Sequence, residues 1–174
     1  LLSLLNNIMD MSKIESSKYE INAKPFNISS VLDEVYSVFG ATMSTKGIRL
    51  TINSDAVTSP DVIGDEISLR KILNNLLSNA NKFTRSGGRV TIFASQKQMN
   101  EKSSILHLEV ADTGVGISEE FIGHLFEPYT QEMSENGGRA AGSGLGMAIC
   151  KSMIDLQGGS ISVRSRLGEG TTFY

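Results

Sequence analysis

One acidic residue, followed by two glycines, stands at the end of an expected strand. Residues 106–111 alternate apolar and polar side chains, which predicts a half-buried strand, and Asp112-Thr-Gly-Val-Gly-Ile117 follows directly. A carboxylate there can accept a hydrogen bond from an amino group such as that of adenine, while Gly114 and Gly116 let the main chain lie close to a flat ring. On its own, the pattern is more typical of a tight turn between strand and helix.

A second pattern lies on a long helix expected from Asp65 to Phe83. Asn75, Asn79 and Lys82 fall at i, i+4 and i+7, so one helix surface carries two amides and an ammonium group. Amide oxygens suit a hard cation such as magnesium, and an ammonium group suits phosphate. The stripe could therefore hold the charged end of a magnesium nucleotide. An ordinary solvated face is the alternative, although four asparagines on this helix cost helix propensity without a local gain.

A third pattern, Gly142-Ser-Gly-Leu-Gly-Met147, precedes an apolar helix that stops at Gly158. Glycine-freed amides at a helix N-terminus form a natural phosphate cradle. Met147 stands where the third glycine of a dinucleotide fingerprint would fall, and the chain has no phosphate loop with Gly-Lys-Ser/Thr. Neither Rossmann-type nor P-loop-type binding is supported.

Composition narrows the class of protein. The chain has 174 residues, 40% of them hydrophobic, and a formal net charge of −3 with a pI near 5.4, so nucleic acid is not an expected partner. Its one cysteine, Cys150, excludes an internal disulfide and fits a small core residue. No apolar run approaches the roughly 20 residues of a membrane span. Because the chain starts mid-helix without Met, we expect a cytoplasmic piece of a longer protein, with membrane anchoring of the parent left open.

The elements that position these patterns follow from periodicity. The first helix ends near 16–18 and has an apolar stripe that favours a helical bundle over packing on the following domain: Leu1, Leu4, Leu5, Ile8, Met11 and Ile14. A helix through about Thr45 should bury Val31, Leu32, Val35, Phe39 and Met43, and the helix from Asp65 should bury Ile67, Ile72, Leu73, Leu76, Leu77 and Ala80. Strands are expected at 49–53, 62–63, 89–94, 160–164 and 171–174, a polar turn at 96–103, a short helix at 118–126 and a loop at 130–141.

Taken in order, these patterns, together with Phe-Glu-Pro-Tyr at 126–129 and Gly-Glu-Gly-Thr-Thr-Phe at 168–173, closely resemble the catalytic ATP-binding domain of sensor histidine kinases. That domain belongs to the superfamily that also holds gyrase, Hsp90 and MutL ATPases. The resemblance implies an α+β fold, a two-layer α/β sandwich of the Bergerat type whose mixed sheet carries helices on one face, after an N-terminal helix. Residues 1–20 would be the end of the dimerisation and histidine-phosphotransfer helix, and residues 21–174 the catalytic domain.

The same resemblance assigns site residues, with ATP and Mg²⁺ as cofactors. Asn79 would bind the metal with Asn75 beside it, Lys82 would reach the phosphates, Phe83 would lie on the adenine face, and Asn75 and Lys82 would be catalytic. Asp112 would take the adenine amino group. The remaining nucleotide contacts would be Gly114, Gly116, Ile117, Gly142, Gly144, Leu145, Gly146 and Thr171. A lid at 126–141 would carry Phe126 and Tyr129, and Arg139 would replace the arginine that several relatives place where Thr130 stands.

The resemblance also implies partners: the missing phosphotransfer helix of the same protein, a response-regulator receiver domain, and a second copy in a full-length homodimer. Superfamily ATPases carry a glutamate where this chain has Asn75, which cannot act as a general base, so hydrolysis should be slow. His107 and His124 lack the following acidic residue of the family's acceptor, so the fragment should bind ATP without phosphorylating itself. A nucleotide-responsive interaction module and a superfamily ATPase remain the alternatives.

Overall fold

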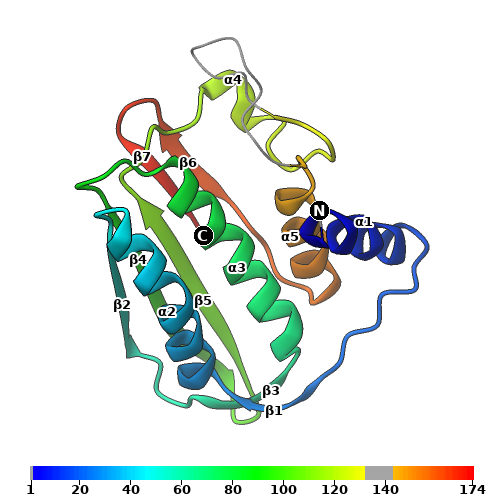
Figure 1. Ribbon diagram of the computed structural model, residues 1–174. Helices are drawn as coiled ribbons and strands as arrows, with labels where there is room; N and C mark the ends of the chain where they lie inside the picture. Colours follow the sequence, from blue (N-terminus) through cyan, green and yellow to red (C-terminus); the bar gives the residue numbers. More distant parts are fainter. Residues whose placement is uncertain (1, 132–142) are drawn as a thin grey trace.

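The computed structural model describes residues 2–131 and 143–174, and Figure 1 shows their arrangement. The helices are α1 (Leu2–Glu15), α2 (Ile28–Thr45), α3 (Glu66–Phe83), α4 (Glu119–Ile122) and α5 (Gly146–Leu156). The strands are β1 (Lys24–Asn27), β2 (Arg49–Ala56), β3 (Asp61–Gly64), β4 (Arg89–Asn100), β5 (Ser103–Asp112), β6 (Val163–Arg166) and β7 (Gly170–Phe173).

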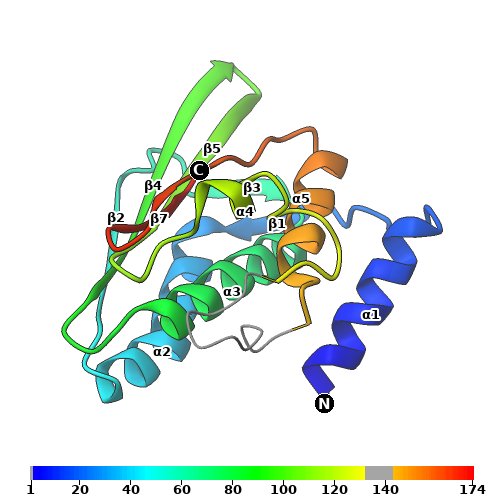
Figure 2. The same ribbon diagram turned by 90° about the horizontal axis from the view of Figure 1, so that it is seen from above.

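Five strands form a mixed sheet in the order β2-β4-β5-β7-β6, in which β2 and β4 are parallel and the other neighbours antiparallel. The helices α2, α3 and α5 lie on one face of this sheet, as the two views in Figures 1 and 2 show. The short strands β1 and β3 pair separately. The expected two-layer α/β sandwich with an N-terminal helix is confirmed.

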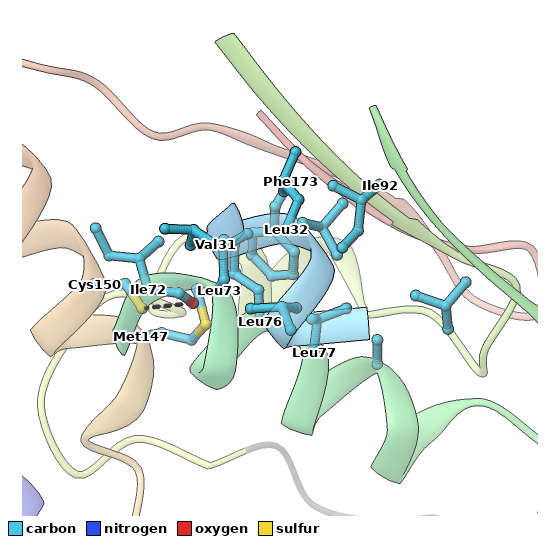
Figure 3. Packing of buried hydrophobic residues seen from close by; sticks show 14 of the residues in the cluster. Val31, Leu32, Ile72, Leu73, Leu76, Leu77, Ile92, Met147, Cys150 and Phe173 are labelled. Carbon is cyan, nitrogen blue, oxygen red and sulfur yellow. Dashed lines mark hydrogen bonds between the residues drawn. The ribbon is translucent and has the colours of Figure 1, made fainter. Parts of the chain in front are cut away.

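The core fills the space between the sheet and the helices. Val90, Ile92 and Ala94 alternate along β4 and are at most 3% exposed, so the strand turns its apolar face toward the helical layer. From α3, Leu73 and Leu77 are fully buried. Figure 3 shows these side chains interdigitating with those of α2 and α5. Cys150 is buried among them, as expected of a small core residue, and burial raises the pKa of its thiol to about 12.

A buried aspartate starts α3 and fastens the preceding segment to it. Asp65 accepts hydrogen bonds from the backbone and hydroxyl of Ser68, at 3.0 and 2.8 Å, and from the backbone N–H of Asn22 at 3.2 Å. Burial alone would raise the pKa of Asp65, but these donors stabilise the carboxylate and the net pKa is lowered. Tyr19 adds a hydroxyl contact to Ser68 at 2.7 Å. The segment between α1 and β1 is thereby tied to the N-terminus of α3.

The apolar stripe of α1 left two alternatives, packing on the following domain or joining a helical bundle, and the structure has features of both. Met11 is buried at 8% exposure, and Asp10 pairs with Lys71 of α3 at 2.8 Å, so one side packs on the domain. Most other large apolar side chains of α1 are exposed: Leu4, Leu5, Ile8 and Met9. The division at residues 20 and 21 into two functional units stays a prediction. Across the described residues, no helix has the length and hydropathy that crossing a membrane requires.

Several predicted boundaries were wrong. The polar stretch at 96–103 is not a loop, because β4 and β5 continue pairing almost to the turn at Glu101. The strand β1 was missed because Pro25 suggested only a break, whereas it lies in an edge strand. The strand expected at 160–164 lies instead at Val163–Arg166. The short helix expected at 118–126 ends at Ile122. Ile67 is 52% exposed and Phe39 only half-buried, contrary to the expected apolar faces.

The packing of α3 predicts a large stability loss on truncation at its centre. Leu77→Ala should lower the free energy of unfolding by about 3 kcal/mol, because the side chain is fully buried and leaves a cavity. The neighbouring exposed Ser78 provides the control, since Ser78→Ala should change it by less than about 0.5 kcal/mol. Urea unfolding monitored by circular dichroism measures both. Equal effects at the two positions would contradict the observed face of α3.

Candidate functional site

Asp112 ends β5 with its carboxylate held by main-chain amides. The N–H of Gly114 donates to Asp112 Oδ1 at 2.7 Å. Burial removes water from the half-buried carboxylate and raises its pKa, and the backbone N–H groups of Gly114 and Thr171 offset only part of that effect. A partly desolvated carboxylate, whose two oxygens have about four acceptor positions, is suited to an additional ligand N–H group.

The main chain around this carboxylate is packed so closely that side chains are excluded. A Cβ atom on Gly170, which has a φ of +104°, would lie 2.0 Å from Asp112 O. A Cβ atom on Gly116, with a φ of +73°, would lie 2.1 Å from Arg166 O. Glycine is therefore required at both positions by close approach and by backbone conformation. The loop after β5 and the β6–β7 turn form one compact backbone layer.

Hydrogen bonds connect this layer to β6 and to the end of α3. Ile117 N donates to Ser165 Oγ at 2.8 Å, and Ser165 Oγ lies 2.9 Å from Thr171 Oγ1. Val115 N donates to Phe83 O, the last residue of α3, at 3.3 Å. The structure thus places Asp112, Gly114, Gly116, Ile117 and Thr171 around one loop, beside the C-terminal end of the asparagine helix.

The amide stripe of α3 faces the first turn of α5. Asn75 and Asn79 are both half-buried. Asn75 Nδ2 donates to Gly146 O at 3.5 Å, and Asn79 Nδ2 lies 3.3 Å from Met147 Sδ. Leu145, immediately before α5, is fully buried. Gly146 and the two amides therefore share one edge, although α3 and α5 are separated by more than 60 residues in the chain.

Lys82 completes the stripe at the last turn of α3. Its ammonium group lies 4.3 Å from the centre of the Phe83 ring, a cation–π distance. Partial burial lowers the pKa of Lys82. Lys82 is nevertheless an exposed residue, and an ammonium group suits phosphate oxygens.

The two ends of the segment between Tyr129 and Gly144 meet. Tyr129 N donates to Gly144 O at 2.9 Å, and Tyr129 has a φ of +64°, which is strained for a residue with a side chain. Phe126 is half-buried, whereas Tyr129 is 69% exposed. Gly142 and Arg139 lie outside the described residues, as does most of the expected lid.

Comparison with known proteins identifies the family of this chain. The family model described as "Histidine kinase-, DNA gyrase B-, and HSP90-like ATPase" matches residues 64–174, more than half of the chain. The chain belongs to this family. Within this family, the chain is an ATP-binding catalytic domain of the sensor histidine kinase type. Its membership of the family is the evidence that it binds ATP.

Individual relatives agree with that assignment. The chain is 37% identical to the autoinducer 2 sensor kinase/phosphatase LuxQ of Vibrio parahaemolyticus over 99% of its own length and 20% of that protein. It superposes on full-length ShkA in complex with AMPPNP with a TM-score of 0.80 and 30% identity, covering 99% of this chain and 34% of ShkA. ThkA in complex with the response regulator TrrA has the same fold, with a TM-score of 0.70 and 22% identity over 98% of this chain and 46% of ThkA. The chain spans about a fifth of its curated relative.

Two residues in contact with the candidate site were not among the sequence predictions. Met147 was noted only as a departure from a dinucleotide fingerprint, and its contact with Asn79 depends on the approach of α5 to α3. Ser165 bridges Ile117, Gly170 O and Thr171, and a lone serine in a short strand gives no signal for that role. A separate cleft of about 230 Å³ lies between α1, the following segment and α3, and its lining includes none of the predicted site residues.

The raised pKa of Asp112 predicts a pH-dependent cost of keeping it charged. The folded domain favours the protonated carboxyl group, so the stability contribution of Asp112 is complete below about pH 3.8 and is lost as pH rises through its folded-state pKa. Asp112→Asn stays neutral and should avoid this loss. The free energy of unfolding of Asp112→Asn minus that of wild type should therefore be larger at about pH 7 than at about pH 4.

Urea unfolding at the two pH values measures this difference. Asp55→Asn is the matched control, because it removes the same charge from an exposed position on β2. A difference between Asp112→Asn and wild type that is independent of pH, or equal to that of the control, would contradict a buried charged carboxylate.

Proposed function

We propose that this domain binds magnesium-ATP at the edge where β5, α3 and α5 meet, and transfers the γ-phosphoryl group to a histidine on another helix of the same protein. The observation that carries the proposal is the convergence of three separate patterns. The loop after Asp112 is bonded to the end of α3 through Val115 and Phe83, and the stripe of α3 is bonded to the start of α5 through Asn75 and Gly146. A carboxylate, two amides and a helix N-terminus thus line one site.

Each part recognises a different portion of the nucleotide. The Asp112 carboxylate accepts backbone hydrogen bonds from Gly114 and Thr171, and its remaining acceptor capacity would take the adenine amino group. The close-packed main chain at Gly114 and Gly116, with Ile117 and Thr171, would border the base. Lys82 and the N-terminus of α5, with Gly144, Leu145 and Gly146, provide positive potential for the phosphates. Phe83 borders the base end of the site.

The donor set also fits magnesium. Asn75 and Asn79 each engage a protein acceptor through the amide nitrogen, which leaves an oxygen for a hard cation. Among the described residues there is no group of three or more His, Cys, Asp or Glu side chains that could hold a metal, so the amides and the phosphates themselves would supply the ligands. Bound magnesium would neutralise phosphate charge during transfer.

Catalysis then rests on positioning and electrostatics. Phosphoryl transfer needs in-line alignment and charge neutralisation, and Lys82 supplies a cation beside the amide stripe. Asn75 stands where a hydrolase needs a base to activate water, and an amide cannot take a proton at neutral pH. Its side chain is also engaged with Gly146 O. The site therefore supports kinase chemistry over rapid hydrolysis.

The acceptor histidine and the downstream partner lie outside this chain. His107 is on β5 beside Glu109, and His124 is beside Glu127 after α4, so neither histidine is on α1. The exposed apolar side of α1 fits the missing helix of a phosphotransfer bundle and a second copy of the protein. A response-regulator receiver domain is the proposed next acceptor, by analogy with the ThkA–TrrA complex.

Adenine recognition through Asp112 predicts a specific loss of affinity. In Asp112→Asn, a single oxygen must serve both the Gly114 N–H and the ligand amino group, so one of these donors would face the Asn amide nitrogen. Affinity for magnesium-ATP should fall at least about tenfold, roughly 1.4 kcal/mol. Calorimetry measures this change, with Asp55→Asn as the charge-matched control. Retention of wild-type affinity by Asp112→Asn would exclude this carboxylate as the base-recognition group.

The kinase proposal predicts transfer only when the missing helix is supplied. The domain alone, incubated with γ-labelled ATP and magnesium, should form no acid-labile phosphohistidine. Addition of the histidine-containing helix of the same protein should produce it, and Asn79→Ala should abolish it by removing a proposed metal ligand. Nucleotide binding without transfer in the presence of that helix would instead favour a nucleotide-responsive interaction module. Rapid phosphate release by the domain alone would favour an ATPase.

A further inference from the structure

Met147 places its thioether against the amide of Asn79. The methionine belongs to the first turn of α5 and is only 7% exposed, and Figure 3 shows it beside α3. Asn79 Nδ2 lies 3.3 Å from Met147 Sδ, within hydrogen-bonding range for sulfur. The contact joins an apolar core residue to a residue of the proposed metal site.

The chemistry of sulfur decides how the amide is turned. A thioether can accept a hydrogen bond but has no proton to donate, so the amide nitrogen must face it and the amide oxygen must face away. None of the described residues donates a hydrogen bond to Asn79 Oδ1. The oxygen is thus left for a ligand, while the nitrogen is held by the protein.

We propose that Met147 is a positioning residue that fixes the orientation of the Asn79 amide, so that its oxygen is presented to the magnesium of the bound nucleotide. This inference rests on the proposed function and deepens it. Without an acceptor in this half-buried place, the amide nitrogen would be unsatisfied, and the side chain would turn to another orientation. The orientation required for metal binding would then be populated for a smaller part of the time.

The amide of Asn75 is also held by a residue of α5. Orientation of the amides is therefore a feature of the contact between α3 and α5. Asn75 Nδ2 donates to Gly146 O, and the Asn75 side chain also reaches Cys150, one turn further along α5. Both amides therefore use their nitrogens in contacts with α5, although the Asn75 oxygen also borders Gly146, 3.3 Å from where a Cβ of that residue would stand. The Gly146 carbonyl cannot be removed by substitution, whereas the sulfur of Met147 can.

Met147→Leu tests the role of the sulfur, because it keeps an apolar side chain of similar volume and removes the acceptor. Met153→Leu is the matched control: Met153 lies on the same helix, is 1% exposed, and makes no described hydrogen bond to a side chain of the stripe. Two quantities are measured. One is the side-chain NH₂ resonance of Asn79 in the nucleotide-free domain, assigned with Asn79→Ala. The other is ADP affinity by calorimetry, with magnesium and with EDTA.

Met147→Leu should shift the Asn79 NH₂ resonances toward those of a solvated amide and should reduce the magnesium-dependent gain in ADP affinity about three- to tenfold. Affinity in EDTA should stay near that of wild type, and Met153→Leu should change neither quantity. Unchanged Asn79 resonances, or equal effects of the two variants, would overturn the positioning role. If wild type shows no magnesium-dependent binding, the proposed function fails, while the resonances of the free domain still test the contact with Met147.

Discussion

The site depends on main chain packed directly against main chain where β5 ends. The Asp112 carbonyl lies where a Cβ of Gly170 would be, and the Arg166 carbonyl lies where a Cβ of Gly116 would be. These contacts leave no room for side chains, and beside them burial desolvates the carboxylate of Asp112, which backbone N–H groups of Gly114 and Thr171 stabilise. A charged group held by few, directional amides has a fixed position, which is what recognition of one ligand donor requires.

The same constraint extends to α3. The loop after Asp112 is bonded to Phe83 O, so the carboxylate and the end of the asparagine helix cannot move independently without losing that bond. The stripe residues Asn79 and Asn75 are one and two turns further back and contact α5. A rigid helix thereby sets the spacing between the proposed base end and the proposed phosphate end of the site. Substitutions in the core of α3 would alter that spacing without touching a ligand.

Patterns within one element were readable from the sequence, and contacts between elements were not. The stripe of α3 follows from a spacing of four residues, and the strand before Asp112 follows from alternation. By contrast, β4 and β5 run through polar residues up to Asn100, because the far end of this hairpin has little core to cover and hydrogen-bond pairing alone sustains it. The role of Met147 required knowing that α5 lies on α3. Thr171 was assigned only through family resemblance, because its pairing with Asp112 is a matter of strand register.

The N-terminal helix has features of both interpretations of its apolar stripe, packing on the domain and a place in a helical bundle. A single apolar stripe usually implies one partner, yet α1 buries Met11 on the domain and leaves Ile8 and Met9 exposed. Asp10 supplies the electrostatic part of the docking, and its partner Lys71 precedes Asn75 by one turn of α3. The face of α3 that carries the amide stripe therefore also carries the contact with α1. A partner that covered the exposed apolar residues of α1 and shifted this helix would act on the same face of α3 that carries the proposed metal ligands.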